Sequence, residues 1–320
     1  MLEFSPIVIT VYDRHSHFIR CLTSLRTCTG SEKTPVYIGI DHPRTPEVEN
    51  RQNQIIDFLK DFKGFKYIRI IRHGKNLGPR GNAKAVISLV LKSYDSFIRS
   101  EDDNVFHKSF LEVINEQLIL NQPDKRIFAI CGYSYPTAQC ELKEHSNRFA
   151  KVSEFYPWGY GTWKDRHESF QLNYYDVFRY LIKPKAFAKF LDNCHFKAVK
   201  GLIVGYCRRH YYTDYMYSAY TNIHDLFCLI PQYSLVRNIG QDESGVNSGR
   251  VDSMMNQILF NGKGQTLLDD SFNCSDRHKI NRNQYFDTEF GWKSVDSKIL
   301  LYPIIVVLYI LDFFIRFKPK

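Results

Sequence analysis

A strand–helix alternation that repeats four times in the first hundred residues constrains the fold of this chain most strongly. Short apolar runs rich in β-branched and aromatic residues lie at residues 7–12, 35–40, 67–71 and 94–99. Between them, apolar residues at helical spacing predict helices over 18–25, 47–63 and 83–91, the last after a turn at 78–81. This alternation predicts an α/β fold with a mainly parallel central sheet and helices on both faces.

The rest of the chain has a mixed pattern. We expect helices over residues 110–120 and 185–191, a strand over 126–132, and a glycine-rich mobile loop over 238–264. The stretch from Trp158 to Trp163 alternates aromatic rings with glycines. Its rings either stack on sugar faces or pack in the core.

Composition narrows the class of partner. The formal net charge of +9, from 43 basic and 34 acidic residues, indicates an anionic partner: a nucleotide, a nucleic acid or an acidic membrane surface. The eight cysteines include no C-x-x-C pair, so we expect reduced thiols and no zinc-ribbon site. The first residues lack the basic and apolar regions of a signal peptide. We therefore expect a cytoplasmic catalytic body.

An apolar stretch covers residues 299–317 and is followed by a basic end. It is nearly long enough to span a bilayer, which takes about 20 residues, but Pro303 and Asp312 oppose a spanning helix. A helix lying in the membrane interface fits the same residues. We expect a hydrophobic, membrane-associated helix over residues 299–320; the alternative is a helix packed on the body of the protein.

Polar clusters follow the four predicted strands. They are Asp13-Arg14, Asp41, Asn76-Leu77-Gly78 and Glu101-Asp102-Asp103. Because ligands of such sheets bind beyond the carboxyl ends of the strands, these clusters predict a binding site at that edge. The first strand is not followed by G-x-G-x-x-G, and the chain has no Walker A motif, which disfavours dinucleotide-binding and P-loop sites. Arg80 lies in a glycine turn that can meet a phosphate.

The three consecutive acids from Glu101 to Asp103 carry the sharpest chemical signal. Their mutual repulsion is relieved by a divalent cation that bridges them to an anionic ligand; Mg²⁺ or Mn²⁺ takes one or two carboxylates and a diphosphate. The alternative is a solvated acidic turn that caps the next helix. Arg14 suits a phosphate and Asp41 a ribose or base. A surface ion pair of Asp13 with Arg14, and an Asx turn at Asp41, explain the same residues.

These motifs together resemble nucleotide-sugar glycosyltransferases of the GT-A fold. The opening segment and Asn76-Leu77-Gly78 are similar to family 2 enzymes. Asp13-Arg14, Glu101-Asp102-Asp103 and a later segment resemble N-acetylglucosaminyltransferase I; that segment comprises Tyr212 to Met216, Cys228 to Pro231 and Asn238 to Gly249. Its last part also resembles bacterial surface-polysaccharide transferases, as does the stretch from Trp158 to Arg166. The resemblance covers about residues 5–260 and implies the GT-A type of sheet.

The resemblance implies a role for each matching residue. A nucleoside-diphosphate sugar donor would contact Asp13, Arg14, Asp41, Asn76, Arg80, Glu101 and Asp102. Arg14 would bind the diphosphate and Asp41 the nucleoside, whereas Asp102 and Glu101 would touch the ribose and the donor sugar. Asp103 would ligate Mn²⁺ or Mg²⁺.

Asp214 matches the carboxylate that acts as general base in the inverting enzymes. The preceding residue, Thr213, stands where a second acid or a tryptophan is common. Asp242 and Glu243 are therefore reserve candidates for the base. The alternative for Asp214 is a buried structural acid within an aromatic run.

The resemblance also implies an organisation and an activity. Residues 1–120 would bind the nucleotide sugar, residues 121–265 would form the acceptor-binding and catalytic half of the same domain, and residues 266–298 would connect to the tail. The reaction would be an inverting transfer to a hydroxyl of a glycan or lipid-linked acceptor, in surface polysaccharide synthesis. The enzyme would work at the inner face of the cytoplasmic membrane surface, with no nucleic acid partner.

Two other functions compete with this one. A nucleotidyltransferase of similar fold would also use acids and a metal, but it would need a glycine-rich, lysine-bearing loop directly after the first strand, where Asp13-Arg14-His15 stands. A nucleic-acid-binding module would need basic and aromatic residues interleaved on one element. Here acids cluster at the strand ends, and they repel phosphates unless a metal is bound.

Overall fold

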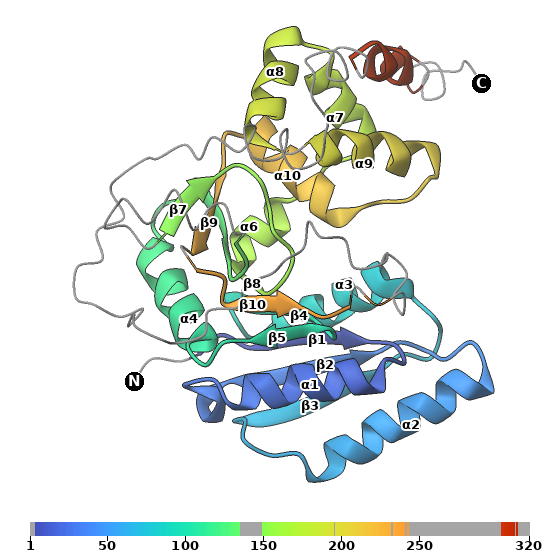
Figure 1. The fold of residues 1–320 in the computed structure, drawn as a ribbon, viewed down its shortest axis with the longest axis vertical. Helices are drawn as coiled ribbons and strands as arrows, with labels where there is room; N and C mark the ends of the chain where they lie inside the picture. The colour runs from blue at the N-terminus through green and yellow to red at the C-terminus, as the bar shows by residue number, and fades with distance from the viewer. Residues whose placement is uncertain are drawn as a thin grey trace.

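The computed structural model describes residues 4–134, 149–194, 196–231, 233–240, 242, 302–310 and 312. The first half of the described chain alternates strands and helices as the sequence predicts (Figure 1). Its elements are β1 (Ile7–Val11), α1 (His15–Arg26), the 3-10 helix η1 (Ser31–Lys33), β2 (Pro35–Ile40), α2 (Pro46–Asp61), β3 (Tyr67–Arg72), α3 (Gly78–Val90) and β4 (Ser96–Glu101).

The second half is more irregular. In chain order its elements are β5 (Asn104–Phe106), α4 (Phe110–Asn121), β6 (Ile127–Cys131), β7 (Phe149–Val152), β8 (Tyr160–Trp163), α6 (Lys164–Ser169), α7 (Tyr174–Leu181), α8 (Pro184–Asn193), α9 (Phe196–Cys207), α10 (Thr213–Ile223), β9 (Phe227–Pro231) and β10 (Val236–Asn238). Residues 302–310 are also helical.

One eight-stranded sheet organises the molecule, in the order β3-β2-β1-β4-β8-β6-β9-β7. The pairs β3/β2, β2/β1, β1/β4 and β6/β9 are parallel, whereas β8 and β7 run antiparallel to their neighbours. Right-handed crossovers place α1 and α2 on one face of this half and α3 on the other. The expected α/β fold with a mainly parallel sheet is confirmed.

The inner strands of the sheet are easily recognised in the sequence because both faces of the sheet are covered by other parts of the protein. Every residue of β2 is buried, and β1 is buried except at Thr10, so both read as continuous apolar runs. The edge strand β3 is different, because Arg69 and Arg72 are exposed there. Charged side chains on an edge strand discourage pairing with another chain.

Two predicted boundaries were wrong. Residues 78–81 are not a turn before a helix but the first turn of α3 itself, with Pro79 at its N-terminus. Proline suits that position because the first helical N–H groups have no partner within the helix. Strand β4 begins at Ser96 and runs to Glu101, so Glu101 belongs to the strand and not to the turn.

The aromatic stretch from Trp158 to Trp163 packs in the core. It contains β8, whose four residues are all buried, and Trp163 donates its indole N–H to the carbonyl of Leu118 at 3.0 Å. Tyr160 stacks edge-on against Phe97. Of the two readings left open by the sequence, core packing is the one found.

A second hydrophobic cluster joins the four helices α7 to α10. Its buried members include Phe178, Phe190, Leu202 and Met216. The 302–310 helix packs on this cluster through Ile305 and Leu308. This agrees with the alternative interpretation of the apolar stretch, a helix packed on the body of the protein. Apart from Asp312, the other residues of 299–320 lie outside the described part. Among the described residues, no helix has both the length and the apolar character needed to cross a membrane.

The predicted loop at 238–264 lies outside the described residues except for 238–240 and 242. Five of the six described cysteines are buried, and Cys207 is exposed.

Candidate active site at the carboxyl ends of the strands

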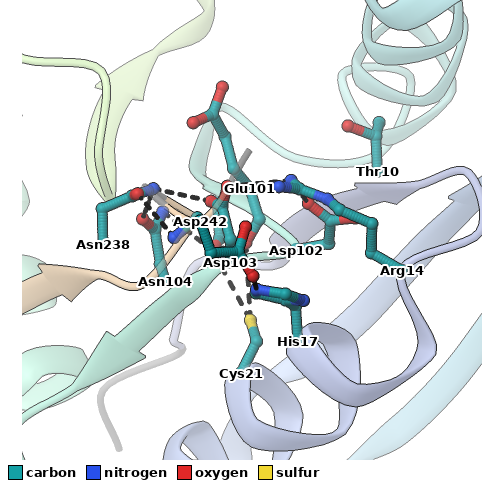
Figure 2. Close-up of polar contacts among 12 residues, drawn as sticks. Thr10, Arg14, His17, Cys21, Glu101, Asp102, Asp103, Asn104, Asn238 and Asp242 are labelled. Carbon is teal, nitrogen blue, oxygen red and sulfur yellow. Dashed lines mark hydrogen bonds and ion pairs between the residues drawn. The ribbon is translucent and has the colours of Figure 1, made fainter. Parts of the chain in front are cut away.

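The ends of β1 and β4 bring Arg14 together with two consecutive acids (Figure 2). Arg14 donates from Nη2 to Asp103 Oδ2 at 2.8 Å, and from Nε to Asp102 Oδ2 at 3.3 Å. Its Nη2 also forms an ion pair with Asp102 Oδ1. These contacts hold the two carboxylates side by side around one guanidinium, as the predicted register of the strand ends implies.

This cluster holds more negative than positive charge in a buried setting. Asp102 and Asp103 are 5% and 7% exposed. Burial raises the pKa of Asp102 to about 6, because the lost hydration outweighs the attraction of Arg14, and the neighbouring Asp103 adds repulsion. A further positive charge would therefore be stabilised here.

Strand β10 returns from far along the chain to fix the Asp103 carboxylate. It pairs antiparallel with β5, which sets Asn238 opposite Asn104. The Asn238 amide donates to Asp103 Oδ1 at 2.7 Å and to Asn104 Oδ1 at 3.2 Å, and its own oxygen accepts the N–H of Gly240 at 3.0 Å. The N–H of Ile239 donates to the Asp103 carbonyl at 2.8 Å. Asp103 is thus held through both its side chain and its main chain.

Gly240 lies so close to this cluster that a side chain does not fit. A Cβ built on Gly240 would lie 2.8 Å from Asp103 Cγ and 3.0 Å from Arg14 Nη1, and nearer still to Asp103 Oδ2. Real Cβ atoms are essentially never found within 3.0 Å of another heavy atom. A side chain at position 240 would therefore displace the Asp103 carboxylate, the Arg14 guanidinium or the backbone at Gly240.

Glu101 extends away from the Arg14–Asp102–Asp103 cluster in the view of Figure 2. Burial raises the pKa of Glu101 to about 8, and the charges of Asp103 and Asp214 add to the effect while Arg99 opposes it. The raised pKa favours the protonated carboxyl, which can donate a hydrogen bond. Asp214, the predicted base, is among the charges that act on this carboxyl.

Asp214 lies in the first turn of α10. Burial raises its pKa, while His210 and a hydrogen bond from its own backbone act in the opposite direction. A half-buried carboxylate with a raised pKa is a stronger base than an exposed one. The role of Asp214 as general base stays a prediction, and the alternative of a buried structural acid stands beside it.

Asp41 and Asn76 form a second network, at the ends of β2 and β3. Asp41 is buried, and its Oδ1 accepts the N–H of His42 at 2.9 Å and that of Leu77 at 2.8 Å. Asn76 donates to the His42 carbonyl at 2.7 Å. Asp41 thus links the end of β2 to the start of α3, whereas an isolated Asx turn would involve only neighbouring residues.

The remaining predicted donor residues take other partners. Asp13 pairs with Arg51 of α2, whose Nη2 and Nε lie 2.6 Å and 3.0 Å from Asp13 Oδ2. Arg80 stacks on the ring of Tyr211 at 3.7 Å from its centroid, in the segment that leads into α10. The alternative of an ion pair between Asp13 and Arg14 is not found, since Asp13 pairs with Arg51 and Arg14 with Asp102 and Asp103.

Three residues of the site were missed by sequence reasoning. Asn238 and Gly240 belong to a motif that carried a resemblance but no role. His17 lies one helical turn after Arg14, a spacing that puts both on one side of α1, and its Nε2 is 3.0 Å from Asp242 Oδ2. Asp242, a reserve base, thus contacts His17, and Glu243 lies outside the described residues.

The donor set suits a hard cation. In the described part of the chain, no three His, Cys, Asp or Glu side chains are grouped to hold a metal alone. Mg²⁺ and Mn²⁺ sites that act on phosphates do not require this, because one or two carboxylates, water and phosphate oxygens complete the coordination. The buried carboxylates of Asp102 and Asp103 are donors of the type that such an ion takes.

Comparison with known proteins adds little beyond the general arrangement. No protein-family model and no curated protein matches the chain. Among solved structures, S. aureus TarS 1-349 in complex with UDP-GlcNAc is 12% identical, with 49% of this chain and 44% of that chain covered and a TM-score of 0.35. The mannosyltransferase PcManGT from Pyrobaculum calidifontis in complex with GDP-Man and Mn²⁺ is 9% identical, with 69% of each chain covered and a TM-score of 0.40.

The chain spans less than half the length of the TarS structures it matches. At these identities and TM-scores, the likeness assigns neither activity nor substrate to this chain.

Proposed function

We propose that this chain is an inverting, metal-dependent glycosyltransferase. It would move a sugar from a nucleoside-diphosphate donor to a hydroxyl of a glycan or lipid-linked acceptor, in surface polysaccharide synthesis at the cytoplasmic membrane surface. The observation that carries the proposal is the buried cluster of Arg14, Asp102 and Asp103 at the carboxyl ends of β1 and β4. A guanidinium, carboxylates for a cation and a separate base at Asp214 are the groups that such a transfer needs.

Binding of the diphosphate would involve Arg14 and Asp103. The Nε and Nη2 groups of Arg14 serve the two carboxylates, so Nη1 is the group that we assign to the diphosphate. Mn²⁺ or Mg²⁺, held by Asp103 beside Asp102, would neutralise charge on the leaving diphosphate. Without such a cation, the two carboxylates would repel the donor.

The nucleoside would lie over the ends of β1, β2 and β3. Asp41 and Asn76 are fixed there by backbone hydrogen bonds, which gives a rigid surface for a base or ribose. Asp13 borders the same region from the end of β1, held by its pair with Arg51. Arg80 would face the other end of the donor, since it lies against Tyr211 near α10.

Transfer would proceed as a single displacement. The acceptor hydroxyl gives its proton to the Asp214 carboxylate as its oxygen bonds to the anomeric carbon. The bond from that carbon to the diphosphate oxygen breaks, and its electron pair leaves with the diphosphate. Attack from the side opposite the leaving group inverts the anomeric centre. Protonated Glu101 would donate a hydrogen bond to the donor sugar without repelling the diphosphate.

A panel of sugar nucleotides, with and without Mn²⁺, tests the proposal. Thermal stabilisation by a ligand measures binding directly. We expect at least one nucleoside-diphosphate sugar to raise the melting temperature in a Mn²⁺-dependent manner. The same donor should then be consumed with release of nucleoside diphosphate when an acceptor is added. Stabilisation by none of the donors, with or without the cation, would refute the proposal.

A further inference from the structure

Exposed apolar side chains concentrate on the 302–310 helix. In the described part of the chain, seven large hydrophobic residues are exposed, and three of them belong to this helix. They are Ile304, Val307 and Ile310, with exposed fractions of 44%, 54% and 46%. A spacing of three residues keeps them on one side of a helix. The helix therefore presents an apolar stripe to solvent.

The opposite side of this helix is fixed to the protein. Ile305 and Leu308 are buried in the cluster of α7 to α10. The Tyr302 hydroxyl donates to the carbonyl of Ile182, and Tyr309 stacks on Tyr175 with 5.4 Å between ring centroids. These contacts set the rotation of the helix about its axis, so the stripe keeps a fixed direction.

A helix that is apolar all round is normally covered on all sides. Residues 302–310 contain no charged residue, and only one of their two sides is covered by the described protein. A helix that is anchored to the protein on one side and apolar on the other suits a position along a lipid surface.

The charge around the helix selects the kind of surface. The helical region at residues 173–225 holds eight Lys and Arg against four Asp and Glu. Arg179 is close enough to act on the Tyr309 hydroxyl, and exposed Lys183 follows the residue that binds Tyr302. Among the four acids, Asp225 is paired with Lys189. Basic side chains beside an apolar stripe suit anionic headgroups.

We propose that the stripe of Ile304, Val307 and Ile310 lies in the interface of an anionic lipid bilayer, with Arg179, Lys183 and Lys185 on the lipid phosphates. This deepens the membrane association in the proposed function, but lipid binding does not depend on the transfer reaction. We favour lipid over a second copy of the chain because the stripe is surrounded by basic residues, and two such positively charged surfaces would repel each other.

The 302–310 helix and a helix of the proposed active site belong to the same hydrophobic cluster. Ile305 shares its hydrophobic cluster with Met216 and Ala219 of α10, the helix whose first turn carries Asp214. The helix that would contact the membrane and the helix that carries the proposed base are therefore parts of one packed cluster.

Vesicle flotation tests the surface. The variant Ile304→Ser/Val307→Ser/Ile310→Ser removes the stripe, and Ile119→Ser/Leu120→Ser on α4 removes apolar residues that are 51% and 62% exposed elsewhere. Vesicles of phosphatidylcholine, with and without 30% phosphatidylglycerol, provide the probe. We expect the full chain and the α4 variant to float with the anionic vesicles. The stripe variant should bind them at least tenfold more weakly, with an unchanged melting temperature.

Two further measurements separate the outcomes. Lys183→Gln/Lys185→Gln should weaken flotation on anionic vesicles without affecting the Mn²⁺-dependent binding of donor. Equal flotation of the stripe and α4 variants would overturn the proposal. So would a sedimentation experiment in which the full chain is a dimer that the stripe variant converts to a monomer, because a second copy would then cover the stripe. Donor binding is read independently, so failure here leaves the proposed reaction standing.

Discussion

Replacing Gly240 by alanine tests the geometry of the site with one methyl group. The added Cβ would lie 2.8 Å from Asp103 Cγ, inside the distance that real Cβ atoms keep. The Asp103 carboxylate has little room to retreat, because Asn238 holds Oδ1 and Arg14 holds Oδ2. Relief therefore requires either that Asp103 rotates or that the loop carrying Gly240 moves away.

The magnitude follows from the contacts that would be lost. A hydrogen bond to a charged group contributes about 1.5–3 kcal/mol, and the cost of an overpacked site is about 1–3 kcal/mol. Loss of one of the two side-chain bonds to Asp103 thus perturbs the cation site by roughly 2 kcal/mol. Since about 1.4 kcal/mol corresponds to a factor of ten, donor affinity in the presence of Mn²⁺ should fall about 30-fold.

Calorimetric titration of the donor with Mn²⁺ measures this affinity. Gly74→Ala is the matched control, since a Cβ at Gly74 meets nothing within 4 Å. We expect Gly74→Ala to bind donor like the unaltered chain, and both variants to show cooperative unfolding. Donor affinity within twofold of the unaltered chain for Gly240→Ala would refute the reasoning, because the close approach of Gly240 to Asp103 would then be without consequence.

Three other changes separate the roles within the site. Asp103→Ala should abolish Mn²⁺-dependent nucleotide binding and leave the fold intact, as checked by calorimetry and circular dichroism. Asp214→Asn should leave donor affinity nearly unchanged and lower turnover by about 10²–10⁴-fold, the usual contribution of a general base, as measured by release of nucleoside diphosphate; equal turnover would move the role to Asp242. The pKa of Glu101 is raised from 4.5 to about 8 in the folded chain, so the folded chain binds this proton more tightly than the unfolded chain does. The stability that protonation of Glu101 contributes is therefore lost as pH rises from about 4.5 to 8. Glu101→Gln should therefore lose less melting temperature between pH 5 and pH 8 than the unaltered chain does.

The parallel half of the fold could be predicted because each of its strands carries its own signal. Inner strands covered on both faces read as continuous apolar runs, and the helices between them read as amphipathic segments. Strands β5 and β10 have three residues each, too few for any pattern to appear. The start of α3 was misread because Gly78-Pro79 is typical of a turn, and proline at a helix N-terminus gives the same letters.

The site could be predicted only where it follows a strand. Arg14, Asp41 and Asp103 stand directly after recognisable strands, and the topology brings Arg14 and Asp103 together. Asn238 is 135 residues away from Asp103, and its place beside Asp103 depends on the pairing of β10 with β5. Such a contact leaves no local pattern in a single sequence.

The charge state of the site implies an order of events in the proposed reaction. Arg14 neutralises one of the two buried carboxylates it contacts, and the raised pKa of Glu101 favours its uncharged form. One negative charge therefore remains in the cluster when both Asp102 and Asp103 are ionised. A nucleoside diphosphate alone would add further negative charge, whereas a cation alone would be attracted. We therefore expect the cation to bind before the donor or together with it, so that donor affinity depends on Mn²⁺ concentration.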